Sequence, residues 1–175
     1  MNQEALNNMK ARRSCRAFTS QMPPRELVAT VCEAGTYAPT GRGKQSPIIL
    51  AVTNKALRDR LSRMNAAIMG TEGDPFYGAP VVLVVLADRT ASTAQYDGCS
   101  VMCQLVNAAH AVGLASCWIH RAKEEFDSEE GKAILRELGI EGDYVGVGHC
   151  ILGYAAKELA PAPPRKADYI RWVED

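Results

Sequence analysis

The strand-forming segments constrain the fold of this chain most strongly, because two of them are apolar without interruption. The run Val81–Leu86 consists only of valine and leucine, and Ile48–Val52 is also continuous and β-prone. Such runs lack the alternation of a strand with one wet face, and they are typical of strands buried on both faces. Val145–Leu152 and the short Cys117–Ile119 are two further predicted strands. We therefore expect a sheet with helices packed around it.

Helical segments separate these strands. The early elements are mostly helical and the last strand pair is joined through a helix, so we expect an α+β fold with a mixed central sheet flanked by helices. The segment 97–112 is apolar on most sides, which indicates that it is buried, and a second subunit can supply part of its cover. The predicted helices cover residues 3–9, 23–35, 54–68, 97–112 and 127–139, with Asn54 and either Asp127 or Ser128 as N-caps, Gly113 as a stop, and Leu57, Leu61, Met64 and Ile68 facing inward.

Length and composition favour one globular unit. The chain has 175 residues, of which 47% are hydrophobic, and we expect a single domain over residues 1–175 with a proline-rich tail from about residue 155. The formal net charge is zero, so the chain has no bulk attraction for nucleic acid or anionic membranes. The longest apolar run, Ala79–Ala87, is too short to span a bilayer, and the N-terminal residues are polar. These features predict a cytoplasmic protein.

The cysteines and histidines do not form a recognisable metal or disulfide pattern. The six cysteines include no C-x-x-C pair, and the three histidines, at positions 110, 120 and 149, are unclustered. We expect free, mostly buried thiols and no metal site. Cys15 lies beside arginines that would favour its thiolate, so redox sensing through Cys15 is an additional hypothesis.

The most distinctive local feature is a basic segment at residues 12–16, Arg-Arg-Ser-Cys-Arg. Alternate residues of an extended segment share a face, so Arg12, Ser14 and Arg16 would converge on one point. Guanidinium groups and a hydroxyl around one point form a phosphate clamp. The alternative, which the local sequence leaves open, is a solvated basic turn. A second basic pair, Arg165-Lys166, follows the proline-rich tail, which could deliver it to a fixed place.

Two loops are candidates for ligand contact. The loop Ala38–Pro47 leads into a buried strand and can present backbone N–H groups, Thr40 and Gln45. It is not a dinucleotide fingerprint, and the chain has no Walker A, G-x-S-x-G or H-E-x-x-H motif. His120 follows the predicted end of a strand, where functional residues are often found, whereas His110 and His149 are expected in the core.

Taken in order, these segments resemble the nitroreductase family of FMN-dependent oxidoreductases, over nearly the whole chain. The residues that carry the resemblance are Arg12–Phe18 (Arg-Arg-Ser-x-Arg-x-Phe), the loop Ala38–Pro47, Gly78-Ala79-Pro80 before a strand, Asp97 opening an alanine-rich helix that leads into Val112–Ile119, and Gly153-Tyr154 followed by prolines and Arg165-Lys166.

The resemblance implies an intertwined homodimer with FMN at the subunit interface. Residues 12–16 would hold the phosphate, with Arg13 as a weaker member, and the basic pair of the tail would join them. Residues 39–41 of the partner subunit would lie along the isoalloxazine, and Gln45 would hydrogen-bond near the ring. Residues 119–121 would border the other edge of the flavin. Arg16, or Lys44 in reserve, would stabilise the reduced flavin near N1–C2. The implied cofactor-binding residues are Arg12, Arg13, Ser14, Arg16, Pro39, Thr40, Gly41, Gln45, Ile119, His120, Arg165 and Lys166, with Arg121 a candidate near the ring.

The implied activity is a ping-pong transfer of hydride from NADH or NADPH, through flavin N5, to a nitroaromatic, a quinone or a similar small acceptor. His120-Arg121 stands where the family commonly has small or acidic residues, and we hypothesise a preference for acidic acceptors or an altered flavin potential. The alternatives are another flavin reaction, a flavin sensor or store, and an unrelated α/β phosphate-binding domain.

Overall fold

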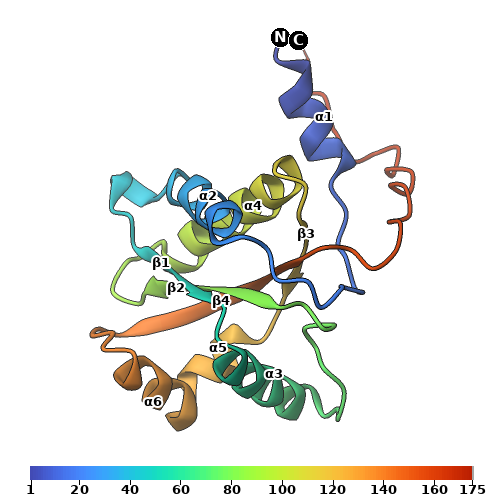
Figure 1. Cartoon of the computed structure of the whole chain (residues 1–175). Coiled ribbons are helices and arrows are strands. Elements are labelled where there is room, and N and C mark those ends of the chain that lie inside the picture. Colours follow the sequence, from blue (N-terminus) through green and yellow to red (C-terminus); the bar gives the residue numbers. More distant parts are fainter. Residues whose placement is uncertain (175) are drawn as a thin grey trace.

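The computed structural model describes residues 1–174, and its centre is a four-stranded sheet with helices on both faces (Figure 1). None of the helices in this range is long and apolar enough to cross a bilayer. In chain order the elements are α1 (Gln3–Ala11), α2 (Arg25–Thr36), a short 3-10 turn (Gly41–Gly43), β1 (Pro47–Val52), α3 (Lys55–Met69), β2 (Val81–Asp88), α4 (Ala94–Ala111), β3 (Ala115–Ile119), α5 (Ala122–Asp127), α6 (Glu129–Glu137) and β4 (Tyr144–Gly153).

The strands lie in the order β1-β2-β4-β3, and each neighbouring pair is antiparallel. The α+β class and the flanking helices are confirmed. A parallel component enters the sheet only through one isolated bridge in the described residues, between Ser14 and Ser116. The expected mixed sheet is therefore antiparallel in all four strands, and the N-terminal segment adds the parallel contact at the β3 edge.

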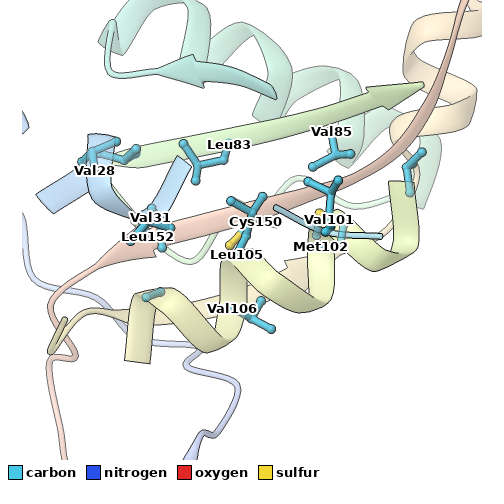
Figure 2. Packing of buried hydrophobic residues seen from close by; sticks show 14 of the residues in the cluster. Val28, Val31, Leu83, Val85, Val101, Met102, Leu105, Val106, Cys150 and Leu152 are labelled. Atoms are coloured by element: carbon cyan, nitrogen blue, oxygen red, sulfur yellow. The ribbon is translucent and has the colours of Figure 1, made fainter. Parts of the chain in front are cut away.

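The uninterrupted run in β2 is buried on both faces, as its composition predicts. Leu83 and Val85 face α2 and α4, where they pack with Cys150 and Leu152 of β4 (Figure 2). The alternate residues, Val82, Val84 and Leu86, face α3, α5 and α6 in a second apolar cluster. Both clusters therefore depend on the same two central strands, β2 and β4.

Polar caps set several helix boundaries where the sequence predicts them. The Asn54 side chain accepts a hydrogen bond from the backbone N–H of Leu57, and Ser128 does the same for Gly131, so Ser128 rather than Asp127 caps α6. Gly113 follows the end of α4 with φ of 79°, a conformation in which glycine has no steric penalty.

Two expectations for the helices are wrong. Ile68, expected to face inward, is 42% exposed, because it lies in the last turn of α3, where the buried stripe has ended. Asp97 does not open the long helix, since α4 begins at Ala94, and the buried Asp97 carboxylate instead binds the loop before β1.

α1 and the C-terminal segment extend from the same end of the molecule and pack little against it (Figure 1). No residue of α1 is buried. The large apolar side chains exposed on these two segments are Leu6, Met9, Tyr169, Ile170, Trp172 and Val173. Apolar surface of this extent on two neighbouring projections is typical of an interface.

Replacing Gly146 with alanine is expected to lower the free energy of unfolding by about 1–3 kcal/mol, the usual cost of overpacking a core. A Cβ atom at Gly146 would lie 2.0 Å from the backbone oxygen of Ala122, where α5 crosses β4. That oxygen belongs to the backbone and cannot move aside as a flexible side chain could. Thermal denaturation would show the loss, and Gly73→Ala is the matched control because its Cβ would meet nothing closer than 3.7 Å. Equal melting temperatures for the two variants would contradict this packing.

Candidate functional site

The basic segment (residues 12–16) runs in extended form along the edge of β3. The backbone N–H of Cys15 donates to the Ser116 carbonyl over 2.9 Å, and Ser14 pairs with Ser116 in the parallel bridge. Cys15 is buried, and its thiol donates to the Ala17 carbonyl, whereas the flanking Ser14 and Arg16 are exposed. The pairing with β3 therefore turns alternate residues of the segment in opposite directions.

Arg12, Ser14 and Arg16 lie close enough to Cys117 to influence its ionisation. Burial raises the pKa of the Cys117 thiol, and the charge of Arg16, a hydrogen bond involving the Ser14 side chain and the charge of Arg12 oppose that rise. The exposure of Ser14 and Arg16, with Cys15 buried between them, places alternate residues of the segment on one side. Within residues 1–174, neither Arg12 nor Arg16 has a carboxylate partner, so their positive charge is not neutralised by the chain.

An unpartnered buried hydroxyl lies beside this charge. The Oγ atom of Ser116 is buried and has no hydrogen-bond partner among the described residues. Ser116 and Arg12 also line a cavity of about 250 Å³, together with the end of α4 and residues 155 and 159. Buried polar atoms in folded proteins nearly always have a partner, so this corner of β3 has the donors of an anion site.

Arg13 lines the same cavity as Arg12 and Ser116 and also contacts the end of α1. Its guanidinium donates to the backbone carbonyl of Lys10 over 2.5 Å and to that of Arg12. These are carbonyls at the C-terminal end of α1, which otherwise have no intrahelical partner. The structure thus engages Arg13 in ending α1 and keeps it beside the cavity that Arg12 and Ser116 line.

The two basic residues of the tail are not brought to the basic segment within one chain. Arg165 donates to the carbonyl of Pro163 over 2.8 and 3.2 Å, and the Lys166 ammonium lies 5.4 Å from the centre of the Tyr169 ring. All of these contacts are internal to the exposed tail.

The loop before β1 is held in shape by Asp97. Its carboxylate accepts hydrogen bonds from the Gly41 backbone at 2.9 Å, Ser46 Oγ at 2.8 Å and Thr93 Oγ1 at 3.0 Å. Burial opposes ionisation of Asp97, but these hydrogen bonds outweigh it and hold the pKa of Asp97 below its ordinary value. Within the loop the Thr40 hydroxyl accepts from the backbone of Gln45, and Pro39 is exposed.

Asp97→Asn is expected to lower the free energy of unfolding by about 2 kcal/mol at pH 7, since hydrogen bonds to a charged group contribute about 1.5–3 kcal/mol each. A carboxylate whose pKa is lowered by folding stabilises the fold above its unfolded pKa of about 3.9, and that stability is lost as the pH falls through the folded pKa. Urea denaturation of both proteins at pH 7 and at about pH 3 would show the difference shrinking in acid. A difference that is equal at both pH values would contradict this role.

The basic segment and the loop before β1 lie at opposite corners of the sheet. β1 and β3 are the two edge strands, so three strand spacings, roughly 14 Å, separate them. Through the strand register, Pro47 is level with Val145 and Ser116 is level with Leu152, which adds roughly 23 Å along the strands. Within one chain, the predicted site residues therefore fall into two distant groups.

The C-terminal end of β3 lies on the same edge of the sheet as the basic segment. Ile119 is buried and follows Ser116 by three residues, so the two positions are roughly 10 Å apart along the strand. His120 is exposed, and Arg121 has φ of 77°, the left-handed conformation that a non-glycine residue rarely adopts. Nε of Arg121 donates to Oδ1 of Asn65 on α3 over 2.9 Å.

The similarity of this chain to known proteins covers the elements described above. A sequence model of the Nitroreductase family matches residues 9–75 and 67–154, which include the basic segment, both loops and every strand. The chain belongs to the nitroreductase family. A relative from Methanothermobacter thermautotrophicus, provisionally named as an NADH dehydrogenase/NAD(P)H nitroreductase, is 25% identical over 158 residues, which are 88% of this chain and 78% of the relative.

Solved nitroreductase structures share the fold closely. A nitroreductase with bound FMN from Bacteroides fragilis superposes with a TM-score of 0.89 at 29% identity, covering 98% of this chain and 99% of the other. A second nitroreductase with bound FMN, from Desulfitobacterium hafniense, gives a TM-score of 0.88 at 29% identity and covers 99% and 100% of the two chains. Both similarities extend over α1 and most of the C-terminal tail.

Sequence reasoning missed four residues that shape this nitroreductase site. Asp97 was expected only as a helix start, although an aspartate in the first turn of a helix is also placed to bind a neighbouring loop. Ser116 had no sequence signal, because its importance depends on pairing with Ser14. Asn65 and Glu125 lie on helices 60 residues apart, and only the fold brings their side chains together.

Proposed function

We propose that this nitroreductase binds FMN and passes hydride from NADH or NADPH to a small acceptor such as a nitroaromatic or a quinone. The observation that carries the proposal is the corner of β3, where Arg12, Ser14 and Arg16 lie on one side of an extended segment without a carboxylate partner in the described residues. When bound, FMN supplies the two-electron chemistry, accepting hydride at N5 and transferring it onward in a ping-pong cycle. The FMN-containing relatives support this choice of cofactor.

The donor set of this corner suits the phosphate end of FMN. Guanidinium groups of Arg12 and Arg16 bind phosphate oxygens bidentately, and the hydroxyls of Ser14 and Ser116 supply further donors. Ser116 Oγ is a buried atom without a partner among the described residues, which a phosphate oxygen would satisfy. We include Arg165 and Lys166 as further candidates, because the exposed tail leaves both of them accessible to a second chain.

The far end of the same strand would hold the ring. A ligand that reaches from Ser116 to Ile119 must be roughly 10 Å long, which suits a mononucleotide-sized molecule with its phosphate at one end. Ile119, His120 and Arg121 would then border the ring, whereas Arg16 would remain with the phosphate roughly 10 Å away. A fixed positive charge beside the ring, such as that of Arg121, would favour the reduced state of the flavin by electrostatics alone. Lys44 is not a candidate within the same chain, because its loop lies at the opposite corner.

We propose that the site is completed by a second copy of the chain. Residues 39–41 and Gln45 lie roughly 20 Å or more from the basic segment in one chain, so they could reach the same FMN only from a partner subunit. The exposed apolar side chains of α1 and the tail, including Met9 and Trp172, support an interface of this kind. The six free cysteines are in keeping with a cytoplasmic location for the dimer.

Anaerobic mixing tests the proposed reaction. We expect either NADH or NADPH to bleach the flavin of the FMN-loaded protein, and an added nitroaromatic or quinone to restore its colour. Double-reciprocal plots at several acceptor concentrations should be parallel, as in a ping-pong cycle. Tightly held FMN that neither donor reduces would contradict the reductase and would instead support a flavin sensor, a flavin store or a different flavin reaction.

A further inference from the structure

A chain of buried polar side chains ends at the turn that follows β3. His149 of β4 and Glu125 of α5 are both fully buried, with Nε2 of His149 3.2 Å from Oε2 of Glu125. The other carboxylate oxygen of Glu125 accepts from Nδ2 of Asn65 on α3. The ring of Phe76 lies 5.1 Å from that of His149 and closes the cluster on its apolar side. Side chains from α3, α5 and β4 thus meet in one buried polar cluster.

Asn65 connects this cluster to the turn through both of its polar atoms. Its Nδ2 also donates to the backbone carbonyl of His120 over 2.9 Å, and its Oδ1 accepts from Nε of Arg121 over 2.9 Å. Asn65 itself is fully buried, so these hydrogen bonds are shielded from water and geometrically fixed. The amide therefore binds both residues of the turn and is itself anchored by Glu125.

The turn has a conformation that needs such support. Arg121 adopts φ of 77°, where a side chain with a Cβ atom is strained and glycine would be the ordinary residue. Strained residues persist when the surrounding contacts over-determine them. The hydrogen bond through Nε orients the guanidinium, and the other two nitrogens make no hydrogen bond to the described residues. The turn thus presents a half-buried, oriented cation whose outer nitrogens are available to an anion.

We propose that Asn65 is a positioning residue that holds Arg121 at the flavin edge, where its guanidinium selects acceptors that carry a carboxylate or a similar acidic group. The inference rests on the proposed function, because it needs the flavin ring at the end of β3. Arg121 contacts the acceptor, whereas Asn65 acts through Arg121. The buried pair of Glu125 and His149 serves to fix the Asn65 amide.

The first test measures the turn directly and does not depend on turnover. We expect Asn65→Ala to accelerate amide hydrogen exchange at residues 120–122 by about tenfold or more, since a lost buried hydrogen bond of about 1.4 kcal/mol changes an opening equilibrium tenfold. Ser62→Ala is the matched control, because Ser62 is buried one turn earlier on α3 and binds Asp74 rather than the turn. Arg121→Ala removes only the hydrogen bond from Nε of Arg121 to Asn65, and it replaces Asn65→Ala in this test if that variant does not fold. Exchange at 120–122 that matches the Ser62→Ala control in both variants would overturn the proposal.

The second test compares 4-nitrobenzoate with 4-nitrobenzamide, which have similar shapes but differ in charge. The wild-type, FMN-loaded protein is expected to have a KM for the benzoate at least about tenfold lower, which corresponds to the weak end of the range for one charge-assisted hydrogen bond. Arg121→Ala and Asn65→Ala should lose this preference because the KM for the benzoate rises toward that for the benzamide, whereas Ser62→Ala should keep it. Equal KM values for the two acceptors in the wild type would overturn the proposal. A wild-type protein that retains no FMN would contradict the proposed function as well, whereas retained FMN without a charge preference contradicts only this inference.

Discussion

Arg16→Ala is expected to weaken FMN binding by about 30- to 100-fold. Arg16 would contribute one or two charge-assisted hydrogen bonds to the phosphate, each worth about 1.5–3 kcal/mol, and each 1.4 kcal/mol changes the dissociation constant tenfold. Arg16 is exposed and has no carboxylate partner in residues 1–174, so its loss should leave the free energy of unfolding within about 0.5 kcal/mol of the wild type. Quenching of FMN fluorescence during titration measures the dissociation constant.

The control for this variant is Arg136→Ala. Arg136 is an exposed arginine in the last turn of α6, on the opposite face of the sheet from α4. Replacing it with alanine removes the same charge from the chain as Arg16→Ala does. Its FMN dissociation constant should equal that of the wild type. If Arg16→Ala also bound FMN as tightly as the wild type, the basic segment would be a solvated turn and not a phosphate clamp.

Glu125→Ala is expected to lower the free energy of unfolding by about 3–5 kcal/mol, since each buried polar group left without a partner costs about 1–3 kcal/mol and the lost side chain adds a cavity. The change would leave Nε2 of His149 and one N–H of Asn65 buried without their partner, and it would also open a cavity. At this chain length the melting temperature should fall by roughly 10 °C, since 1 kcal/mol corresponds to about 2–4 °C. Thermal or urea denaturation of the purified variants provides the measurement.

Glu129→Ala is the matched control for this second prediction. Glu129 lies four residues further along the chain, where its exposed carboxylate pairs with Lys132 and with no other cation in residues 1–174. Surface pairs of this kind contribute about 0–1 kcal/mol, so its loss should be barely detectable. A Glu125→Ala protein that is as stable as Glu129→Ala would show that the buried cluster does not hold α3, α5 and β4 together.

The elements that depend on local pattern could be predicted from the sequence. The run Val81–Leu86 required cover on both faces, and the structure supplies it with α2 and α4 on one side and α3, α5 and α6 on the other. The alternation of Arg12, Ser14 and Arg16 required only an extended backbone, which the bridge to Ser116 provides. The family resemblance, which rests on the order of these segments, is confirmed by the family match.

What the sequence could not predict depends on contacts between distant segments. No local run specifies the strand order β1-β2-β4-β3 or the antiparallel pairing of its neighbours. Asn65, Glu125 and His149 come from three different elements and meet in the fold. None of the three positions stands out in the local sequence of its helix or strand. Arg13 was expected as a weaker member of the phosphate site, and only the fold shows that its side chain returns to the end of α1. Each of these features is set by tertiary geometry rather than by periodicity.

The most direct test of the central claim is the visible absorption spectrum of the purified protein after FMN is added and free FMN is removed by desalting. Flavin absorbance should be retained at about one FMN per chain and should be bleached by NADH or NADPH. Retained flavin that neither donor bleaches would leave FMN binding intact and contradict the reductase. A protein that emerges without flavin absorbance would contradict the assignment of the β3 corner as an FMN site.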